Sequence, residues 1–438
     1  MKVGWKHQFL LWLSAGMSAC LFTSCGEDRT YQYEELTSGN RQMVEILRKN
    51  YLWADEIKTD FDWKGYFGSG DVFFKKLLSS QDRWSYCTID TVKADMFERG
   101  YFNHYNSYGM DFDLIGDPTG ATSRNYVRVL YVAQGSQAEK AGMKRGDFIS
   151  YIGATRITNS NVRYIVNGDG ISMTVNHLAY NAEEEQLYWA DTTEVWMEKS
   201  AYVEDYPYFA TKVFDFGISK IGYLMVTRLI AGPYEKDPAS TLYRDDLDRY
   251  FSNFKSADID HLIVDLRYCN HGEMEMAQRL ASYVAAQKHD GEVWTTTRWR
   301  EDLSQNNTEQ CYDLALTNGH ALDVNKVVFI TGKYTTGAAE WLIQGLRHTL
   351  GSTNVITVGE KTAGQNVMTT PVATDFNMTL YPAVAYVGDA EGNHDYTALQ
   401  TPTVSVKEME YVYLNEYGTT EEILLQYALS ALLNSTGE

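Results

Sequence analysis

The order of apolar and polar positions divides this chain into stretches with three different patterns. Between residue 30 and about residue 98, apolar residues recur at helical spacing, as Met43, Ile46 and Leu47 do. Between about 101 and 200, short β-rich runs such as 126–132 are separated by Gly, Asn and Asp. These patterns predict a small helical N-terminal segment followed by a compact β-rich domain.

Beyond residue 200 the pattern changes to apolar strands that are each followed by a helix. The runs 262–264 and 327–330 precede stretches with apolar residues at i, i+3, i+4 and i+7, and a further apolar run lies at 355–358. Strands of this kind belong in a buried, mainly parallel sheet with helices on its faces. Because 438 residues suffice for two or three domains, we expect a multidomain α/β protein with an α/β core.

The first residues have the pattern of an export signal. Lys2 and Lys6 precede an apolar run over 9–22, which is shorter than the roughly 20 apolar residues that a membrane span needs. The ending Leu-Phe-Thr-Ser-Cys at 21–25 resembles the lipobox of bacterial lipoproteins. The resemblance implies that residues 1–24 are a signal peptide and that Cys25 carries a lipid. We therefore expect a protein anchored in the bacterial cell envelope, at the outer membrane, facing the periplasm or the cell surface.

Composition excludes several classes of function. A net charge of -20 repels phosphate backbones, so nucleic acid is not an expected partner. Apart from Cys20 in the signal and Cys25, three cysteines remain, at 87, 269 and 311, and their number and spacing fit neither a disulfide framework nor a zinc site. Since the nine histidines are scattered, we expect no metal and no cofactor.

The β-rich stretch contains Gly-Ser-Gln-Ala-Glu-Lys-Ala-Gly-Met-Lys-Arg-Gly-Asp-Phe-Ile at 135–149. It resembles the G-S-P-A-x-x-A-G-L-x-x-G-D-x-I segment of PDZ domains in processing peptidases, with Gln137 where Pro is usual. Gly142 and Gly146 suit turns that need a positive φ. The resemblance implies capture of a peptide by strand addition. It assigns the carboxylate-binding loop to Tyr108, Gly109, Met110, Asp111 and Phe112. A domain that only positions its neighbour is the alternative.

The α/β stretch resembles the C-terminal processing (tail-specific) serine peptidases. Residues 263–268 match the family strand that ends in D-L-R, but Cys269, Asn270 and His271 replace most of the Gly-rich turn before Gly272. This puts the oxyanion region, at Gly272 and Ala338, in doubt.

The two catalytic positions of this family are both replaced. Residues 331–340 align with the S-A-S-A-S-E pattern, whose middle Ser, the nucleophile, falls at Gly337 when counted back from Glu340. Residues 359–365 align with G-x-x-T-x-G-K, and Gln365 stands where the family has its general-base Lys. A Ser–Lys pair needs a hydroxyl and a neutral amine, and neither residue supplies one.

The resemblance covers nearly the whole mature chain. After the expected signal peptide at 1–24, it implies a tether and helical segment at 25–100, a PDZ-like domain at 101–200 and a tail-specific peptidase-like α/β domain at 201–438. The function that follows is that of a catalytically impaired homologue that binds peptide or protein C-terminal segments.

Three alternatives stay open. An active serine-type or threonine-type endopeptidase could use Thr335 or Thr336 as a displaced nucleophile, with Lys333 or Lys361 as base, although Thr336 also suits a helix N-cap. Cys269 with His271 could supply a thiolate. A surface lipoprotein could bind a glycan or partner subunit if Trp53, Trp63 and Trp84 line a groove; we expect them in the helical core instead.

Overall fold

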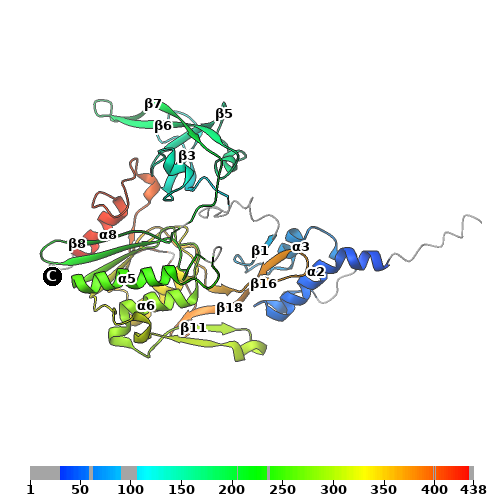
Figure 1. Cartoon of the computed structure of the whole chain (residues 1–438). Helices are drawn as coiled ribbons and strands as arrows, with labels where there is room; N and C mark the ends of the chain where they lie inside the picture. Colours follow the sequence, from blue (N-terminus) through cyan, green and yellow to red (C-terminus); the bar gives the residue numbers. More distant parts are fainter. Residues whose placement is uncertain are drawn as a thin grey trace, which may run out of the picture.

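A helical unit, a β-rich unit and a larger α/β unit make up the fold (Figure 1). This computed structural model describes residues 30–58, 63–89, 106–204, 206–233, 237–397, 399 and 401–433. The expected signal peptide and Cys25 lie outside these residues. In the described part of the chain, every helix is too short or too polar to cross a membrane.

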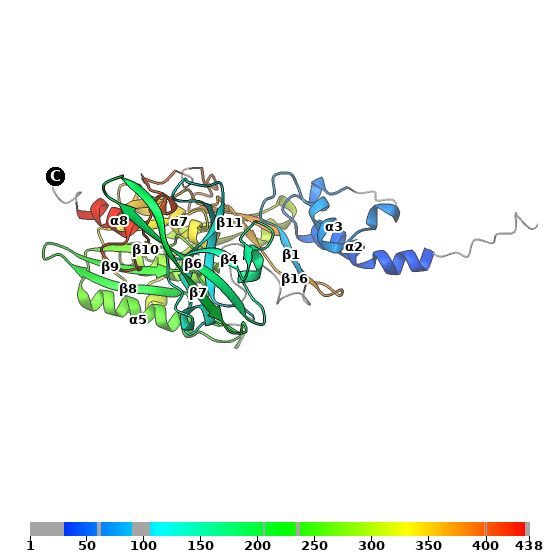
Figure 2. The same ribbon diagram turned by 90° about the horizontal axis from the view of Figure 1, so that it is seen from above.

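The N-terminal unit contains helices α2 (Thr30–Asn50) and α3 (Gly70–Leu77). Met43 and Leu47 of α2 share an apolar cluster with Phe73 and Phe74 of α3. The unit also contains a strand that the expected all-helical pattern omits: β1 (Tyr86–Ile89) pairs antiparallel with β17 (Met378–Tyr381), which pairs with β16 (Val372–Ala373). Four residues are too few to show a strand period, and the partner strand lies far along the chain. Figure 2 shows this unit beside β16, at the end of the molecule away from α8.

The β-rich unit is an antiparallel sheet with strand order β2-β3-β4-β6-β7. Its strands are β2 (Met110–Gly116), β3 (Asn125–Val132), β4 (Phe148–Ile152), β6 (Ile171–Asn181) and β7 (Gln186–Met197), and the short β5 (Thr155–Arg156) pairs with β4. The motif at 135–149 forms the short helix α4 (Gln137–Lys140), and the Ser136 hydroxyl accepts the N–H of Glu139 at 3.1 Å. Gly142 and Gly146 have φ of 82° and 88°, as their turns require.

The α/β unit is built on a six-stranded sheet with strand order β19-β14-β13-β10-β9-β8. All neighbours are parallel except β8 and β9. The strands are β8 (Tyr208–Asp215), β9 (Lys220–Val226), β10 (His261–Asp265), β13 (Lys326–Thr331), β14 (Val355–Gly359) and β19 (Val404–Ser405).

Helices cover both faces of this sheet. On one face, Leu262 and Val264 of β10 join the core beneath α5 (Leu242–Ala257), α6 (Met274–His289) and α7 (Ala338–Leu350). On the other face, Ile263 joins the cluster of α8 (Ile423–Leu433), which also holds Leu130 of β3. Burial on both faces explains why these strands read as continuous apolar runs.

A second, four-stranded antiparallel sheet joins the α/β unit to the N-terminal unit. Its order is β12 (Thr308–Cys311), β11 (Val293–Trp299), β18 (Ala383–Asp389) and β15 (Val367–Thr369). Val367 and Ala383 from this sheet lie in the same apolar cluster as α2 and α3.

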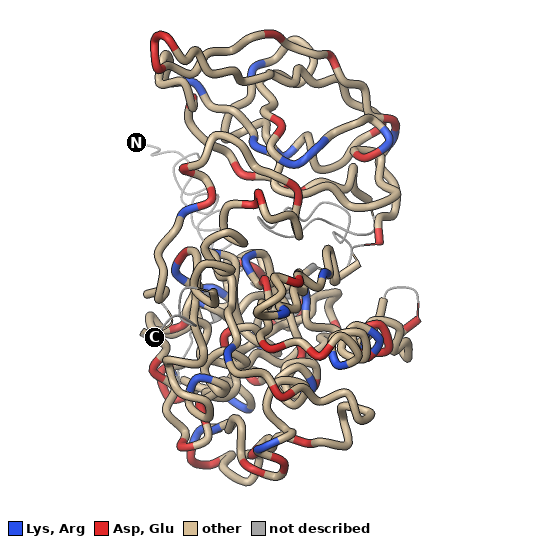
Figure 3. Tube along the Cα trace, turned by 90° about the vertical axis from the view of Figure 1, so that its left-hand side faces the viewer, with Lys and Arg blue, Asp and Glu red and all other residues tan. Residues whose placement is uncertain are grey.

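Charged residues of both signs are spread over the β-rich and α/β units alike (Figure 3).

Candidate active site

The turn after β13 brings the chain sharply from strand to helix. Gly337 is the N-cap of α7 and has φ 58° and ψ -120°, a conformation that favours glycine. The preceding Thr335 is fully buried; its hydroxyl donates to the carbonyl of Leu266 at 2.8 Å and accepts the N–H of Gly332 at 2.9 Å. Thr335 therefore fixes the turn, and its hydroxyl is occupied at both ends.

Gly337 and Gln365 lie next to each other, although 28 positions separate them in the sequence. A Cβ atom placed on Gly337 would lie 3.3 Å from Oε1 of Gln365. The Thr336 hydroxyl donates to the same Oε1 at 2.9 Å, and Nε2 of Gln365 donates to the carbonyl of Val367 at 3.2 Å. The two positions that the family comparison pairs are thus neighbours in the structure.

Glu340 holds the Gln365 segment against α7. Its carboxylate is fully buried and accepts the backbone N–H groups of Gly364 and Gln365, both at 2.7 Å. Burial raises the pKa of Glu340, and a hydrogen bond from Thr362 together with backbone N–H donors opposes that rise. Glu340 therefore acts as a positioning residue, because it orients Gln365 without facing solvent itself.

The turn after β10 lies against the start of α7. Its backbone is tied to Leu229, whose N–H donates to the carbonyl of His271 at 3.0 Å and whose carbonyl accepts the N–H of Glu273 at 2.8 Å. A Cβ atom on Gly272 would lie 2.7 Å from that of Ala338. Only glycine fits at 272, so the predicted oxyanion region is brought together but closely packed.

Two segments of the chain match domains of one peptidase family. Residues 38–86 match the Peptidase S41 N-terminal domain, and residues 220–403 match Peptidase family S41. The chain carries S41 peptidase domains.

One solved structure of an S41 protein resembles this chain over most of its length, and a second solved structure is a weaker match. A Bacteroides fragilis NCTC 9343 protein assigned to the S41 proteases has 26% sequence identity and a TM-score of 0.78, covering 91% of this chain and 98% of that one. The photosystem II D1 C-terminal processing protease has 15% identity and a TM-score of 0.49, covering 85% and 93%. A comparison with curated proteins finds no match.

The other candidate groups of the S41 domain lie in different surroundings. Burial raises the pKa of the Cys269 thiol to about 12, so this thiol is protonated at neutral pH, while the His271 side chain is exposed. Lys361 is exposed. Lys333 forms an ion pair with Asp113 of β2 and so links the turn before Gly337 to the β-rich unit.

The proposed carboxylate-binding loop lies at the start of β2. Tyr108, Met110 and Phe112 are buried in the core of the β-rich unit. Gly109 has φ 83°, its N–H donates to the Ser107 hydroxyl at 2.9 Å, and its carbonyl accepts the N–H of Ala133 at 2.8 Å. Asp111 is also buried.

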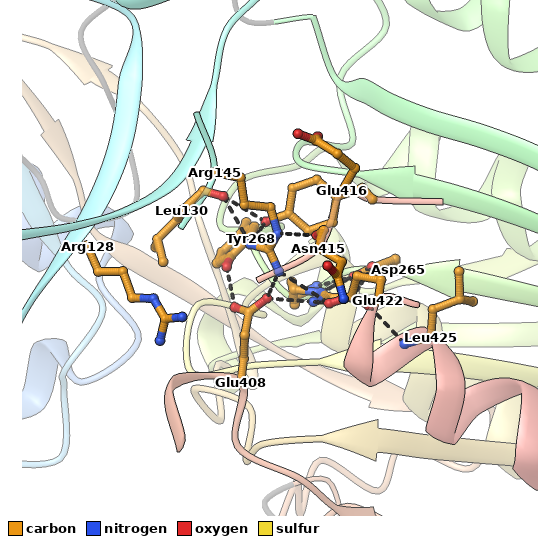
Figure 4. Close-up of polar contacts among 12 residues, drawn as sticks. Arg128, Leu130, Arg145, Asp265, Tyr268, Glu408, Asn415, Glu416, Glu422 and Leu425 are labelled. Atoms are coloured by element: carbon orange, nitrogen blue, oxygen red, sulfur yellow. Dashed lines mark hydrogen bonds and ion pairs between the residues drawn. The ribbon is translucent and has the colours of Figure 1, made fainter. Parts of the chain in front are cut away.

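A buried ionic cluster joins the β-rich unit to the α/β unit (Figure 4). Arg267, two residues after β10, contacts Asp265, Glu408 and Glu422, each at 2.7 Å. Arg145, from the motif of the β-rich unit, contacts the same two glutamates. Burial alone would raise the pKa of Glu408, but the charges of Arg145 and Arg267 lower it to about 2.

This cluster contains the residues that sequence reasoning missed, namely Glu408 and Glu422. The missed signal is Arg267, which lies between Leu266 and Tyr268 just after an apolar strand, because a buried guanidinium requires a carboxylate partner. The expectation that the tryptophans lie in the helical core is only partly right. Trp53 and Trp84 pack against that core but also line a pocket. The side chain of Trp63 is not among those that the structure describes.

Proposed function

We propose that this protein is a non-hydrolysing relative of the C-terminal processing peptidases that binds peptide or protein C-terminal segments. The proposal rests on the short distance between Gly337 and Gln365. A hydroxyl at the first position and an amine at the second would be placed to exchange a proton, since nucleophile and base must lie within hydrogen-bond reach. Glycine offers no nucleophile, and an uncharged amide is no base at neutral pH.

Polar groups near Gly337 and Gln365 already have other partners or are buried. The Glu340 carboxylate accepts two backbone N–H groups, and the Lys333 amine pairs with Asp113. The Cys269 thiol is buried and protonated at neutral pH. These contacts make Glu340, Lys333 and Cys269 poor candidates for hydrolysis and so support a role in binding.

The β-rich unit supports the peptide-binding part of the proposal. It carries the PDZ-like motif at 135–149, folded with the positive-φ turns that this motif needs. The ionic cluster fixes the unit to the S41 domain, and Lys333 touches β2 directly. A segment captured by this unit would therefore be held in a fixed position relative to Gly337 and Gln365.

The decisive experiment compares hydrolysis of a quenched peptide library by the purified protein and by the Gly337→Ser/Gln365→Lys double variant. Each single variant serves as a matched control, because it restores only one of the two groups. We expect no hydrolysis by the unchanged protein and by the single variants, and a gain of activity in the double variant. Hydrolysis by the unchanged protein would overturn the proposal.

Binding is tested separately by fluorescence anisotropy with labelled peptides that carry a free C-terminal carboxylate. The same peptides with an amidated C-terminus are the control. We expect the amidated peptides to bind more weakly, since capture of a terminal carboxylate by backbone N–H groups depends on its charge. Equal affinity for both would exclude C-terminal recognition.

An active threonine-type endopeptidase is the second candidate, and one observation favours it. Thr336 is partly exposed and its hydroxyl lies one residue before the elbow, 2.9 Å from Gln365 Oε1. Any hydrolysis by the unchanged protein that disappears in Thr336→Val would support this candidate over the first.

The location proposed for this protein rests on the sequence around Cys25. We expect the chain to fractionate with the bacterial outer membrane and to become soluble in a Cys25→Ala variant. Labelling of the unchanged protein, and not of that variant, with an alkynyl fatty acid would establish the lipid anchor.

A further inference from the structure

A pocket of about 260 Å³ lies where the N-terminal unit meets the second sheet of the S41 domain. Trp53 follows α2, Arg83 and Trp84 precede β1, and Tyr386 belongs to β18. Asn366 and His394 also line the pocket. Small-molecule sites occur preferentially at such junctions between units, and the volume of this pocket lies just below their usual range.

Aromatic rings of different orientation form the walls. Trp53 meets Tyr386 edge to face, with ring centroids 6.0 Å apart, and Tyr386 is stacked on His394 at 4.3 Å. Trp53, Trp84 and Tyr386 are each only partly buried, although they belong to the residue types that gain most from burial. The pocket thus presents flat apolar faces to whatever enters it.

Polar groups with spare hydrogen-bonding capacity lie beside these rings. The Arg83 guanidinium lies 5.4 Å from the Trp84 ring centre, and among the described residues no carboxylate forms an ion pair with it. Nδ2 of Asn366 donates to the carbonyl of His394 at 2.8 Å, whereas its Oδ1 accepts nothing from the described part of the chain. The pocket therefore offers donors and an acceptor next to aromatic faces.

We propose that this pocket binds one saccharide ring of a glycan. A pyranose ring has an apolar C–H face that stacks on an aromatic ring and hydroxyl groups at its edge that exchange hydrogen bonds with planar amide and guanidinium groups. The volume matches one ring rather than a longer ligand. A neutral ligand also agrees with a lining that holds one guanidinium, that of Arg83, and one carboxylate, that of Asp395.

The saccharide pocket is distinct from the Gly337–Gln365 site. Gln365 directs its side chain to Thr336, whereas the next side chain, Asn366, reaches the His394 carbonyl. Neither Gly337 nor Gln365 lines the pocket. Saccharide binding is therefore independent of peptide binding and of hydrolysis.

The test is a titration of the purified protein with maltohexaose, xylohexaose and chitohexaose, followed by tryptophan fluorescence and calorimetry. We expect saturable binding of at least one oligosaccharide. Trp84→Ala removes one aromatic wall, and His394→Ala removes an exposed stacking ring without touching the core. Each is expected to weaken binding by about tenfold, the loss that corresponds to one aromatic contact.

Trp196→Ala is the matched control, because Trp196 is 57% exposed on β7 and lies outside the pocket. It should leave affinity unchanged, and circular dichroism should show that all variants are folded. Absence of binding across the panel would overturn the proposal. So would binding that survives both Trp84→Ala and His394→Ala, or a sugar-free peptide that loses its affinity in the same two variants.

Discussion

Replacing Glu408 with glutamine is expected to destabilise the folded protein by about 3–5 kcal/mol at pH 7. Glu408 is buried and receives contacts from Arg145, Arg267 and the Tyr268 hydroxyl. Glutamine fills nearly the same space but carries no charge. Two buried guanidinium groups would then share Glu422 and Asp265, and breaking a buried ion pair on one side leaves the other charge uncompensated.

The pKa of Glu408 points in the same direction. It falls from the ordinary value of 4.5 to about 2, because the charges of Arg145 and Arg267 outweigh the effect of burial, so the ionised carboxylate favours the folded state. Because the pKa is lower in the folded state, this stabilisation is complete above pH 4.5 and is lost as the pH falls from 4.5 toward 2. The unchanged protein should therefore lose stability over that range more steeply than the variant.

Urea denaturation at pH 7 and at pH 3 measures both effects. The matched control is Glu410→Gln, because Glu410 pairs with Lys407 on the surface with its side chain 65% exposed and should change stability by less than about 1 kcal/mol. The difference between Glu408→Gln and the unchanged protein should be large at pH 7 and smaller at pH 3. A Glu408→Gln protein as stable as the Glu410→Gln control at pH 7 would refute the argument.

Three further predictions concern Gly337, Glu340 and Cys269. Gly337→Ala should destabilise the protein by about 1–3 kcal/mol in urea denaturation, because φ 58° with ψ -120° strains any side chain; a neutral effect would mean that the elbow relaxes. Glu340→Gln should cost about 1–3 kcal/mol, since an amide cannot accept both N–H groups through two oxygens, and unchanged thermal stability would contradict this role. In the folded protein at pH 8, iodoacetamide should modify Cys311 and leave Cys269 unmodified in peptide mass spectra, because the Cys269 thiol has a pKa of about 12; rapid modification of Cys269 would show that it is accessible as a thiolate.

The pattern of apolar residues is enough to locate β10 and β13, the strands that precede the turns at Gly272 and Gly337. The runs 262–264 and 327–330 fall within β10 and β13, because strands buried on both faces are apolar throughout. The motif spacing also identified Gly337 and Gln365 as partners, and their contact depends only on two turns at the carboxyl ends of neighbouring strands.

Features that depend on distant segments escaped sequence reasoning. Glu408 and Glu422 are ordinary acidic residues in their own surroundings, and only the approach of Arg145 and Arg267 from two other units makes them structural. Trp53 and Trp84 have a pocket between them and β18 because the N-terminal unit docks on a sheet whose strand order is not encoded locally. Such placements require tertiary contacts that neither periodicity nor spacing reveals.

The pairing of β1 with β17 constrains the order in which the protein can be completed. About 300 residues separate Tyr86 from its partner Tyr381. At roughly 5–20 residues per second, a ribosome needs about 15–60 s to make the intervening chain. During that interval Phe73 and Phe74 lack the neighbours that Met378 and Leu380 later supply. The N-terminal unit is therefore made before β17 and can be completed only after β17 has been made.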